Sequence, residues 1–449
     1  MSICTDTRKI KSGDTFYALK GENFDGHDYI LQAFEKGAEY AVCEFIPDNV
    51  LNYDNVNSEN KNSKKYEEKL SEKCKIVNNV LKELLKNSSE YRKCYNIPLI
   101  GITGSVGKTT TKEMVALVMS SKYKTLKTKA NLNNEIGTAW TLLELGDEYT
   151  AAVLEMGMNH FGELKEISNA ARPTCGVITN IGDSHIGNLG SREGILKAKL
   201  EILSGMEPCA PLVINNDDRY LSKLELNRPI VTVGIENKNS NYVAENIILG
   251  DGKTEFDIVY DKKRKHIVLP ALGRHNVLNA LIAFAIGKLY NISAADIATS
   301  LLNYKNVGDR QNIVRKNSYT LIVDCYNASY QSIKASIDVV NEVSGGRKLI
   351  VLGDVLELGD FSQEIHRRIG ELIPVDALFF AYGENMKYAT EGLKNDFIFH
   401  TTSMSELCAA VRDNIRKGDT VSVKGSNAMN LIELVNYLEK EPPACEVIT

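Results

Sequence analysis

Residues 101–112 read Gly-Ile-Thr-Gly-Ser-Val-Gly-Lys-Thr-Thr-Thr-Lys, and this glycine-rich stretch constrains the fold more than any other feature of the chain. An apolar run, Ile97–Ile100, precedes it and predicts a buried strand, while apolar residues recur at helical spacing between 114 and 119. A turn between a strand and a helix lets backbone N–H groups approach a phosphate, and the helix start adds partial positive charge. The stretch therefore predicts a strand, a phosphate-binding loop and a helix in succession.

The loop has the pattern T-G-x-x-G-K-T-T, because the leading glycine of the longer phosphate-loop pattern stands one residue too early. Lys108 is expected to reach the β- and γ-phosphates of ATP, and the Thr109 hydroxyl is expected to bind Mg²⁺. A glycine-rich helix start without a ligand is the alternative, and the flanking strand and helix patterns argue against it. The predicted ATP-binding residues of the loop are Gly104, Ser105, Val106, Gly107, Lys108, Thr109 and Thr110.

Composition argues against several classes of function. Charged residues make up 25% of the 449 residues and hydrophobic residues 43%, which is typical of a soluble globular protein. The net charge of −5 argues against nucleic acid as the main partner. The chain shows no signal-peptide pattern and no run of about 18 apolar residues, so no membrane insertion is expected. Its nine cysteines form no C-x-x-C pair, and a reduced, cytoplasmic protein is expected.

The alternation of strand and helix patterns predicts an α/β fold with three domains. Residues 1–96 are expected to form a small N-terminal α/β domain, in which the polar connector 48–73 is low in complexity and flexible in its first part. Residues 97–309 are expected to form a central parallel-sheet ATPase domain around the phosphate loop (P-loop), with an antiparallel edge at 241–270. Residues 310–449 are expected to form a C-terminal Rossmann-like domain, with strands at 320–324, 348–352, 376–380 and 420–423 separated by helices.

Polar residues follow two further predicted strands of the central domain. Glu155 ends one apolar run, and Asn180, Asp183 and His185 follow the next. Taken singly, each is an ordinary polar group of a loop. The carboxyl ends of neighbouring parallel strands converge, so these side chains are expected together beside the nucleotide. A carboxylate and an imidazole there suit a Mg²⁺ ion that protein and phosphates bind jointly.

Lys199 lies in a segment with helical periodicity, 192–203, which is expected to run near the same strand ends. An exposed lysine on a helix is one interpretation. The other is a lysine that adds CO₂ to become a carbamate, whose oxygens would bind a second Mg²⁺. The residues by themselves leave both interpretations open.

A series of short strings in all three predicted domains resembles the Mur ligases, ATP-dependent amino-acid ligases of peptidoglycan precursor synthesis. The order and separation of the strings make this resemblance specific. They are Thr5–Arg8, Phe24–His27, Gly101–Glu113, Asn131–Gly137, Glu155–His160, Thr179–His185, Gly190–Ser191, Gly273–Ala280, Asp324–Ala328, Leu352–Gly359 and Lys424–Ser426.

The resemblance implies a role for each residue of the predicted centre. Lys108 and Thr109 would bind ATP and Mg²⁺, Glu155 and His185 would be magnesium ligands, and Lys199 would be the carbamylated lysine. The implied catalytic residues are therefore Lys108, Glu155, His185 and Lys199, and the implied metal ligands are Thr109, Glu155, His185 and Lys199.

The resemblance also divides the substrates among the domains. The first domain would hold the uridine nucleotide, the central domain ATP, and the third domain the incoming amino acid or dipeptide. Asn279, Arg310 and Asp324 would complete the ATP site from the far side. The implied substrate-binding residues are Thr7, Arg8, Asn134, Asn327, Lys424 and Ser426.

Two of the strings, Asp324–Ala328 and Leu352–Gly359, favour one branch of the family. That branch adds D-alanyl-D-alanine to UDP-N-acetylmuramoyl-tripeptide through an acyl phosphate and releases ADP and phosphate. A Mur-type or folylpolyglutamate-type ligase with another amino acid is the first alternative, and a nucleotide-gated binding protein without ligase activity is the second. The resemblance leaves open whether the tripeptide carries lysine or diaminopimelate, and a monomer is expected.

Four positions depart from the family pattern. Val106 stands in the loop where many relatives have asparagine, and Asn427 stands where arginine is common. Ala139 and Tyr330 stand where proline is expected. Because backbone N–H groups do the binding in a phosphate loop, Val106 is expected to leave the loop functional.

Overall fold

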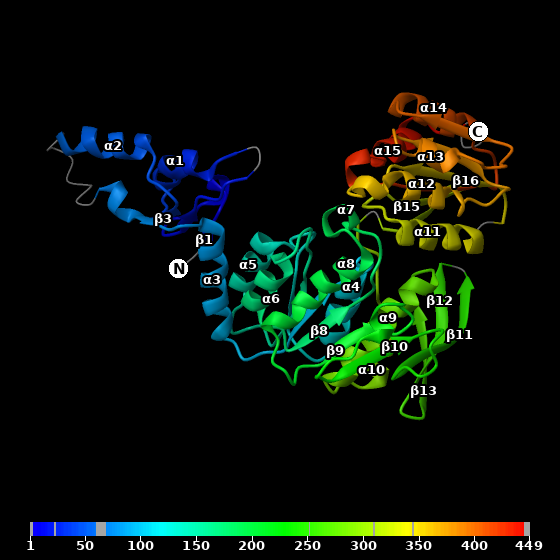
Figure 1. The fold of residues 1–449 in the computed structure, drawn as a ribbon, viewed down its shortest axis with the longest axis horizontal. Coiled ribbons are helices and arrows are strands. Elements are labelled where there is room, and N and C mark those ends of the chain that lie inside the picture. Colours follow the sequence, from blue (N-terminus) through cyan, green and yellow to red (C-terminus); the bar gives the residue numbers. More distant parts are fainter. Residues whose placement is uncertain are drawn as a thin grey trace.

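The computed structural model describes residues 3–21, 24–59, 69–250, 252–308, 310–343 and 345–443, which form three separate sheets with their helices (Figure 1). The first sheet is wholly parallel and has the order β1-β2-β3-β4. Helix α1 packs beside it through Ile30 and Ala33. The elements of this domain are β1 (Ile3–Cys4), β2 (Thr15–Tyr17), α1 (Ile30–Glu35), β3 (Tyr40–Cys43), α2 (Asp48–Glu59) and β4 (Cys74–Ile76).

The first part of the connector 48–73 is predicted to be flexible, but the structure has a helix there. Asp48–Glu59 forms helix α2, and Leu70–Lys73 forms a 3₁₀ turn, while residues 60–68 lie outside the described part. Val50 of this helix is fully buried in the small core of the first domain, and partly buried Tyr53 packs against the same core. Two such contacts in a mostly polar sequence give too weak a periodic signal for a helix to be predicted.

The second sheet has nine strands and places β5 (Leu99–Thr103) between β7 (Ala151–Glu155) and β8 (Cys175–Ile178), with all three parallel. This neighbourhood is the one predicted for the phosphate loop and the polar strand ends. The far edge is antiparallel, as predicted for 241–270. The remaining strands are β6 (Thr125–Lys127), β9 (Leu212–Asn215), β10 (Ile230–Gly234), β11 (Tyr242–Gly250), β12 (Lys253–Tyr260) and β13 (Lys263–Leu269).

Helices cover both faces of the second sheet, as expected for parallel strands that are apolar on both sides. Leu99 of β5 points into the layer formed with α3, α5 and α6, whereas Ile100 and Ile102 point into the layer formed with α4, α9 and α10. The bounds are α3 (Val80–Lys93), α4 (Lys108–Met119), α5 (Glu135–Leu143), α6 (Glu163–Ala171), α7 (Ile186–Leu189), α8 (Arg192–Leu200), α9 (Arg274–Leu289) and α10 (Ala294–Leu302).

The third sheet has the order β14-β15-β19-β16-β17-β18, and only β14 is antiparallel to its neighbour. The strands predicted at 320–324, 348–352 and 420–423 are confirmed, and the one predicted at 376–380 begins two residues later. The elements are β14 (Asn312–Arg315), β15 (Thr320–Asp324), α11 (Tyr330–Val343), β16 (Lys348–Gly353), α12 (Ser362–Gly370), β17 (Leu378–Tyr382), α13 (Lys387–Thr390), β18 (Ile398–Thr401), α14 (Met404–Asn414), β19 (Thr420–Lys424) and α15 (Ile432–Lys440).

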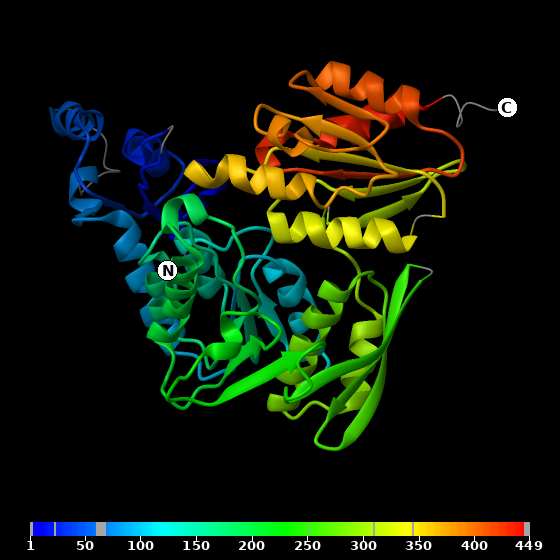
Figure 2. The same cartoon turned by 45° about the vertical axis from the view of Figure 1, so that its right-hand side comes forward.

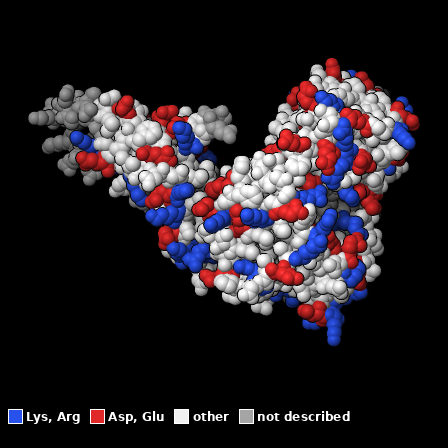
Figure 3. Space-filling view, viewed as in Figure 1, with Lys and Arg blue, Asp and Glu red and all other residues white. Residues whose placement is uncertain are grey.

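The three α/β units confirm the predicted fold class, while the domain limits near residues 96 and 310 stay predictions. Helix α3 packs against both the first domain and the central one, since Val80 and Leu84 share a core with Val42 and with Leu142. The turned view shows the third domain lying over the central domain (Figure 2). In the space-filling view a broad gap separates the first domain from the third, and both signs of charge are mixed over this face (Figure 3).

No helix in the described residues is both long enough and apolar enough to cross a bilayer.

The edge of the central sheet depends on an aromatic cluster that generates a stability prediction. Phe284 of α9 is 0% exposed, and its ring meets those of Tyr260 and Tyr242 edge-on at 5.0 and 5.9 Å. Phe284→Ala should lower the free energy of unfolding by about 3–5 kcal/mol, because it leaves a cavity under the antiparallel edge. Urea unfolding followed by circular dichroism measures the change. Leu302→Ala, at an exposed end of α10, is the control, and equal stability of the two variants would contradict the prediction.

Candidate active site

A cavity of about 510 Å³ opens at the carboxyl ends of β5, β7 and β8, where the central and third domains meet. Both domains line it, and so does the segment that joins them. Its lining includes fourteen of the predicted site residues: Ser105, Val106, Gly107, Lys108, Thr109, Thr110, Asn134, Glu155, His185, Asn279, Arg310, Asp324, Asn327 and Lys424. The predicted residues outside the lining are Thr7, Arg8, Gly104, Lys199 and Ser426.

The phosphate loop follows β5 and is fixed by residues that follow β8. Gly104 has φ 147°, and a Cβ there would lie 1.9 Å from Thr179 Oγ1. Asn180 Oδ1 accepts a hydrogen bond from the Val106 N–H at 3.0 Å, and its Nδ2 donates to the Val106 carbonyl at 2.9 Å. The backbone at Val106 is thus held on both sides without help from its side chain.

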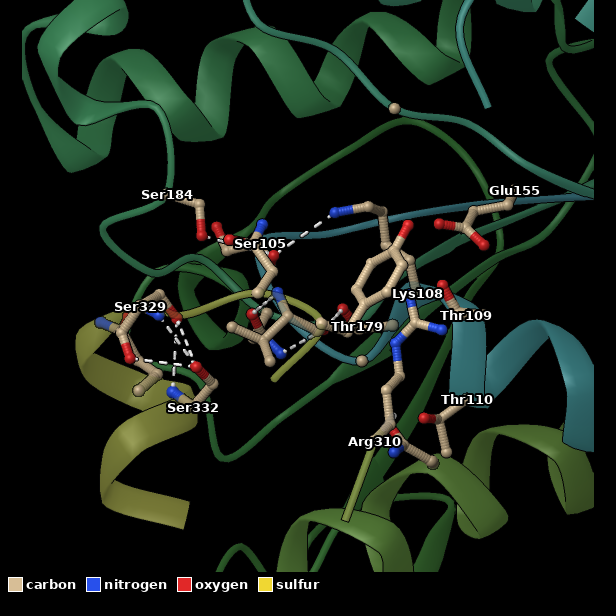
Figure 4. Close-up of a pocket in the computed structure, with 18 of the residues that line it drawn as sticks. Ser105, Lys108, Thr109, Thr110, Glu155, Thr179, Ser184, Arg310, Ser329 and Ser332 are labelled. Carbon is tan, nitrogen blue, oxygen red and sulfur yellow. Dashed lines mark hydrogen bonds between the residues drawn. The ribbon is translucent and has the colours of Figure 1, made fainter. Parts of the chain in front are cut away.

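Lys108 begins helix α4 and folds back over its own loop. Its Nζ donates to the carbonyl of Gly104 at 2.9 Å and lies 3.4 Å from that of Ser105 (Figure 4). Burial lowers the pKa of Lys108, and the carboxylate of Glu155 partly offsets this effect. A phosphate above the loop would replace the two carbonyls with a stronger, charged acceptor.

Glu155 supplies a buried carboxylate that is only partly satisfied. Asn133 donates to its Oε1 at 2.9 Å, while its Oε2 accepts no hydrogen bond from any residue that the structure describes. The nearest cation is Lys112, whose Nζ lies 3.9 Å from that oxygen. A buried carboxylate oxygen without a donor is costly unless an ion binds it, so Glu155 fits a magnesium ligand.

The described residues do not gather enough side-chain ligands to form a metal site by themselves. Over the described part of the chain, no group of three or more His, Cys, Asp and Glu residues could hold a metal ion. Such a sparse donor set suits Mg²⁺, which keeps several waters and is often held by one or two carboxylates together with substrate phosphates. The residues present therefore fit a metal that arrives with a nucleotide.

His185 lies at the start of α7, on the border with the third domain. Its Nδ1 is 2.6 Å from Oε2 of Glu357, although the ring N–H lacks the alignment of a hydrogen bond. The imidazole is the main cause that lowers the pKa of the Glu357 carboxyl. Neighbouring Asp183 is already engaged within the protein, because its Oδ1 and Oδ2 accept hydrogen bonds from Arg192 at 2.6 and 2.9 Å.

Lys199 of α8 is 2% exposed, which excludes the interpretation as an exposed helix lysine. Burial, helped by the nearby positive charge of Lys108, lowers its pKa well below the usual range. A neutral amine is the form that reacts with CO₂, so this environment agrees with the carbamate interpretation.

The far side of the cavity is formed by α9 and by the segment that leads into the third domain. Asn279 Oδ1 accepts from the Thr111 hydroxyl at 3.0 Å and lies against Gly107. The Arg310 guanidinium stacks 3.6 Å above the ring of Tyr326. Figure 4 shows Arg310 reaching toward the end of the loop, where Thr109 and Thr110 begin the helix.

The third domain faces the cavity with an ion pair between neighbouring strands. Lys424 at the end of β19 donates to Asp324 at the end of β15 at 2.7 Å, and it also donates to the Asn327 carbonyl at 3.0 Å. Asp324 and Lys424 are both buried. Ser426 lies behind them and accepts from the Leu356 N–H at 3.0 Å.

Family models match the chain in three consecutive parts. The Mur ligase family catalytic domain matches residues 2–89, the Mur ligase middle domain matches 102–287, and the Mur ligase glutamate ligase domain matches 309–427. The UDP-N-acetylmuramoyl-tripeptide–D-alanyl-D-alanine ligase of Bacillus subtilis (strain 168) is 35% identical, over 98% of this chain and 93% of its own length. The chain belongs to the Mur ligase family. The corresponding ligase of Escherichia coli (strain K12) is 31% identical over 98% of this chain and 94% of its own.

Solved structures of Mur ligases agree with this assignment. MurF from Acinetobacter baumannii superposes with a TM-score of 0.87 at 29% identity, and covers 98% of this chain and 93% of its own. MurF ligase from Thermotoga maritima, solved in complex with ADP, superposes with a TM-score of 0.85 at 25% identity, and covers 98% of this chain and 97% of its own.

In this Mur ligase the predicted residues of the first domain are not among the cavity-lining ones. The Thr7 hydroxyl donates to Gln32 at 2.7 Å and is buried. Arg8 is exposed, and its pairing with Asp6 lowers the pKa of that carboxyl to about 2.

The predicted substrate residue Asn134 belongs to the central domain and lines the cavity. It caps helix α5 by accepting from the Gly137 N–H at 2.9 Å, so its side-chain oxygen is already engaged.

Several cavity-lining residues of this Mur ligase were missed by sequence reasoning, and three of them hold other site residues in place. Asn133 donates a hydrogen bond to Glu155, the ring of Tyr326 stacks against the Arg310 guanidinium, and Gln331 donates to Asp183 across the domain border at 2.8 Å. Asn133 and Tyr326 lie inside strings that had been recognised, which is the signal that could have singled them out. Gln331 had no signal, because its partner lies 148 residues away.

The tight turn of the loop generates the next prediction. Gly104→Ala should weaken ADP binding by about tenfold, because a Cβ would collide with Thr179 and φ 147° strains any other residue. Calorimetric titration with ADP measures the loss. Gly250→Ala is the matched control, since nothing lies within 4 Å of a Cβ built there. Unchanged ADP affinity of Gly104→Ala would show that the loop is not the phosphate site.

Proposed function

We propose that this chain joins D-alanyl-D-alanine to UDP-N-acetylmuramoyl-tripeptide and converts ATP to ADP and phosphate, as the names of its relatives indicate. The observation that carries the proposal is the cavity itself. A phosphate loop on one side faces the buried Asp324–Lys424 pair of another domain on the other side. A nucleotide and an amine substrate can therefore meet in one cleft.

The reaction must make a carboxylate reactive toward an amine. Transfer of the γ-phosphoryl group from ATP to a carboxylate oxygen of the tripeptide gives an acyl phosphate and ADP. The dipeptide nitrogen then forms a bond to the acyl carbon, the nitrogen loses a proton, and phosphate leaves from the tetrahedral intermediate. Each step moves negative charge onto phosphoryl or acyl oxygens, so fixed positive groups must stabilise those oxygens.

The central domain supplies those groups. The loop presents its N–H groups, Lys108 exchanges its carbonyl partners for phosphate oxygens, and Arg310 approaches from the joining segment. Mg²⁺, when bound, would neutralise phosphate charge, and Thr109, Glu155 and His185 are the residues proposed to hold it. Asn279 braces the loop from behind through Gly107.

We assign the carbamate to Lys199. Its buried ammonium would lose one proton, and the neutral amine would then form a bond to CO₂ and lose a second proton, which leaves an anion with two oxygens. Those oxygens suit a second Mg²⁺, which an ammonium would repel. The lowered pKa of Lys199 supports this assignment, because it favours the neutral amine that the addition requires.

The third domain is proposed to hold the dipeptide. A free dipeptide carries an ammonium at one end and a carboxylate at the other. Lys424 has the charge that attracts the carboxylate, while Asp324, which the resemblance assigns to the ATP site, pairs with Lys424 at 2.7 Å and holds its side chain in place. Asn327 lies beside the pair and lines the same cavity. Ser426 acts indirectly, by fixing the loop at Leu356.

The cytoplasmic location and the monomeric state stay predictions, which cell fractionation and sedimentation equilibrium measure.

ADP release with and without dipeptide tests the function. With UDP-N-acetylmuramoyl-tripeptide present, D-alanyl-D-alanine should accelerate ADP release and yield the pentapeptide, whereas glycine and L-glutamate should not. Lys108→Ala should reduce this rate by about 100-fold or more, because it removes a charge that acts on phosphoryl oxygens. A rate of ADP release that is the same with and without the dipeptide would contradict the proposal. Running the assay with lysine-containing and diaminopimelate-containing acceptors identifies the third residue.

Lys199 generates a separate prediction. Lys199→Ala should lose about 100-fold in rate, and short-chain carboxylates should restore part of it by filling the vacated space. Lys199→Arg should resist rescue, because its fixed cation occupies the metal site. Wild-type activity should fall as the pH falls through the lowered pKa of Lys199, since protonation removes the amine that adds CO₂. An active, carboxylate-independent Lys199→Ala enzyme would contradict the carbamate.

A further inference from the structure

Two residues with left-handed backbone face each other across the border between the central and third domains. His185, at the start of α7, has φ 63°, and Glu357, in the loop after β16, also has φ 63°. Neither is a glycine, so both conformations cost energy and persist only where the surroundings enforce them. Such backbone strain indicates that the two residues have a functional role.

The segments that carry these two residues approach each other closely, through side chains and through the backbone. Nδ1 of His185 lies 2.6 Å from Oε2 of Glu357, and the Gly187 N–H donates to the Glu357 carbonyl at 3.3 Å. A Cβ at Gly187 would lie 2.9 Å from that carbonyl, so only glycine permits the approach. The His185 side chain is 18% exposed and that of Glu357 is 55% exposed, so the carboxylate sits at the rim of the contact.

The third domain holds the Glu357 loop rigidly from behind. The N–H of Val355 donates to His366 Nε2 at 3.1 Å, and the N–H of Leu356 donates to the Ser426 hydroxyl at 3.0 Å. These two bonds fix the residues directly before Glu357. The carboxylate is therefore presented to the central domain by a fixed loop and moves with the third domain.

A second pair of hydrogen bonds fixes the same border. The Asp183 N–H donates to Gln331 Oε1 at 3.2 Å, and Gln331 Nε2 donates back to Asp183 Oδ2 at 2.8 Å. Asp183 stands two residues before His185, and Gln331 belongs to α11 of the third domain. The contact at Glu357 thus depends on how the third domain is docked.

A histidine that binds a metal with one ring nitrogen usually gives its other nitrogen to a carboxylate, which fixes the ring and raises metal affinity. With Nδ1 of His185 turned toward Glu357, Nε2 is the nitrogen left for the cavity that His185 lines. We propose that Glu357 is a positioning residue of the third domain, which orients His185 for the metal–nucleotide site. This inference rests on the proposed function, in which His185 binds Mg²⁺, and it makes metal affinity depend on docking of the third domain.

Metal affinity tests the role directly, with Mn²⁺ as the probe and electron paramagnetic resonance as the readout in enzyme saturated with ADP. Glu357→Gln keeps the shape of the side chain and removes its charge, and it should weaken Mn²⁺ binding by about tenfold. Its ADP affinity in EDTA should stay unchanged. Asp360→Asn, an exposed carboxylate three residues further along, is the matched control and should bind both ligands like the wild type.

A double-mutant cycle decides whether Glu357 acts through His185. His185→Ala should itself weaken Mn²⁺ binding, and adding Glu357→Gln should cause no further loss. Unchanged Mn²⁺ affinity in either single variant, or an equal loss on both backgrounds, would overturn the proposal, as would a loss of metal-free ADP binding. Neither the dipeptide nor the tripeptide is needed for this experiment, so its outcome is separate from dipeptide-dependent ADP release. Failure of that release would contradict the proposed function instead.

Discussion

The close contact between the turn after β5 and the strand end of β8 is the constraint on which the site depends. Gly104 leaves no room for a side chain against Thr179, and Asn180 holds both polar groups of the Val106 backbone. These contacts exist because β5 and β8 are hydrogen-bonded neighbours that run in parallel and end together. The same geometry brings Glu155 at the end of β7 to the same edge. Sheet order thus places the loop and the carboxylate, and the cavity follows from it.

Much of the fold could be predicted because buried parallel strands are continuous apolar runs. The strands at 320–324 and 348–352 have the predicted bounds, or nearly so. The failures have physical causes. Helix α2 packs on its core through Val50 and Tyr53 in a mostly polar sequence, and the edge strands β14 and β18 are short and half exposed. Where few side chains are buried, the sequence pattern that reports burial disappears.

The site could be predicted where its residues lie in local motifs, and it could not where they meet across domains. Most of the loop, Glu155 at the end of β7 and His185 after β8 line one cavity. Three contacts of the site join side chains that no spacing rule in the sequence connects. They are Asn133 with Glu155, Gln331 with Asp183, and Glu357 with His185. Thr7 and Arg8 lie in the first domain away from this cavity, so their roles stay predictions. Lys199 shows the reverse case, since its burial separates two interpretations that the sequence left open.

Two buried lysine amines, Lys108 and Lys199, determine how charge is distributed in the site. Burial lowers the pKa of both Lys108 and Lys199, and each ammonium opposes the other, so both cannot be charged without cost. Phosphate above the loop favours the charged form of Lys108 alone. At Lys199, the proposed carbamate replaces a repelling cation with an anion. The two lysines would then carry opposite charges, one matched to phosphate and the other to a divalent ion. A site with such a division of charge is completed only when nucleotide and metal arrive together, which agrees with the finding that the donor set among the described residues is too sparse to hold a metal by itself.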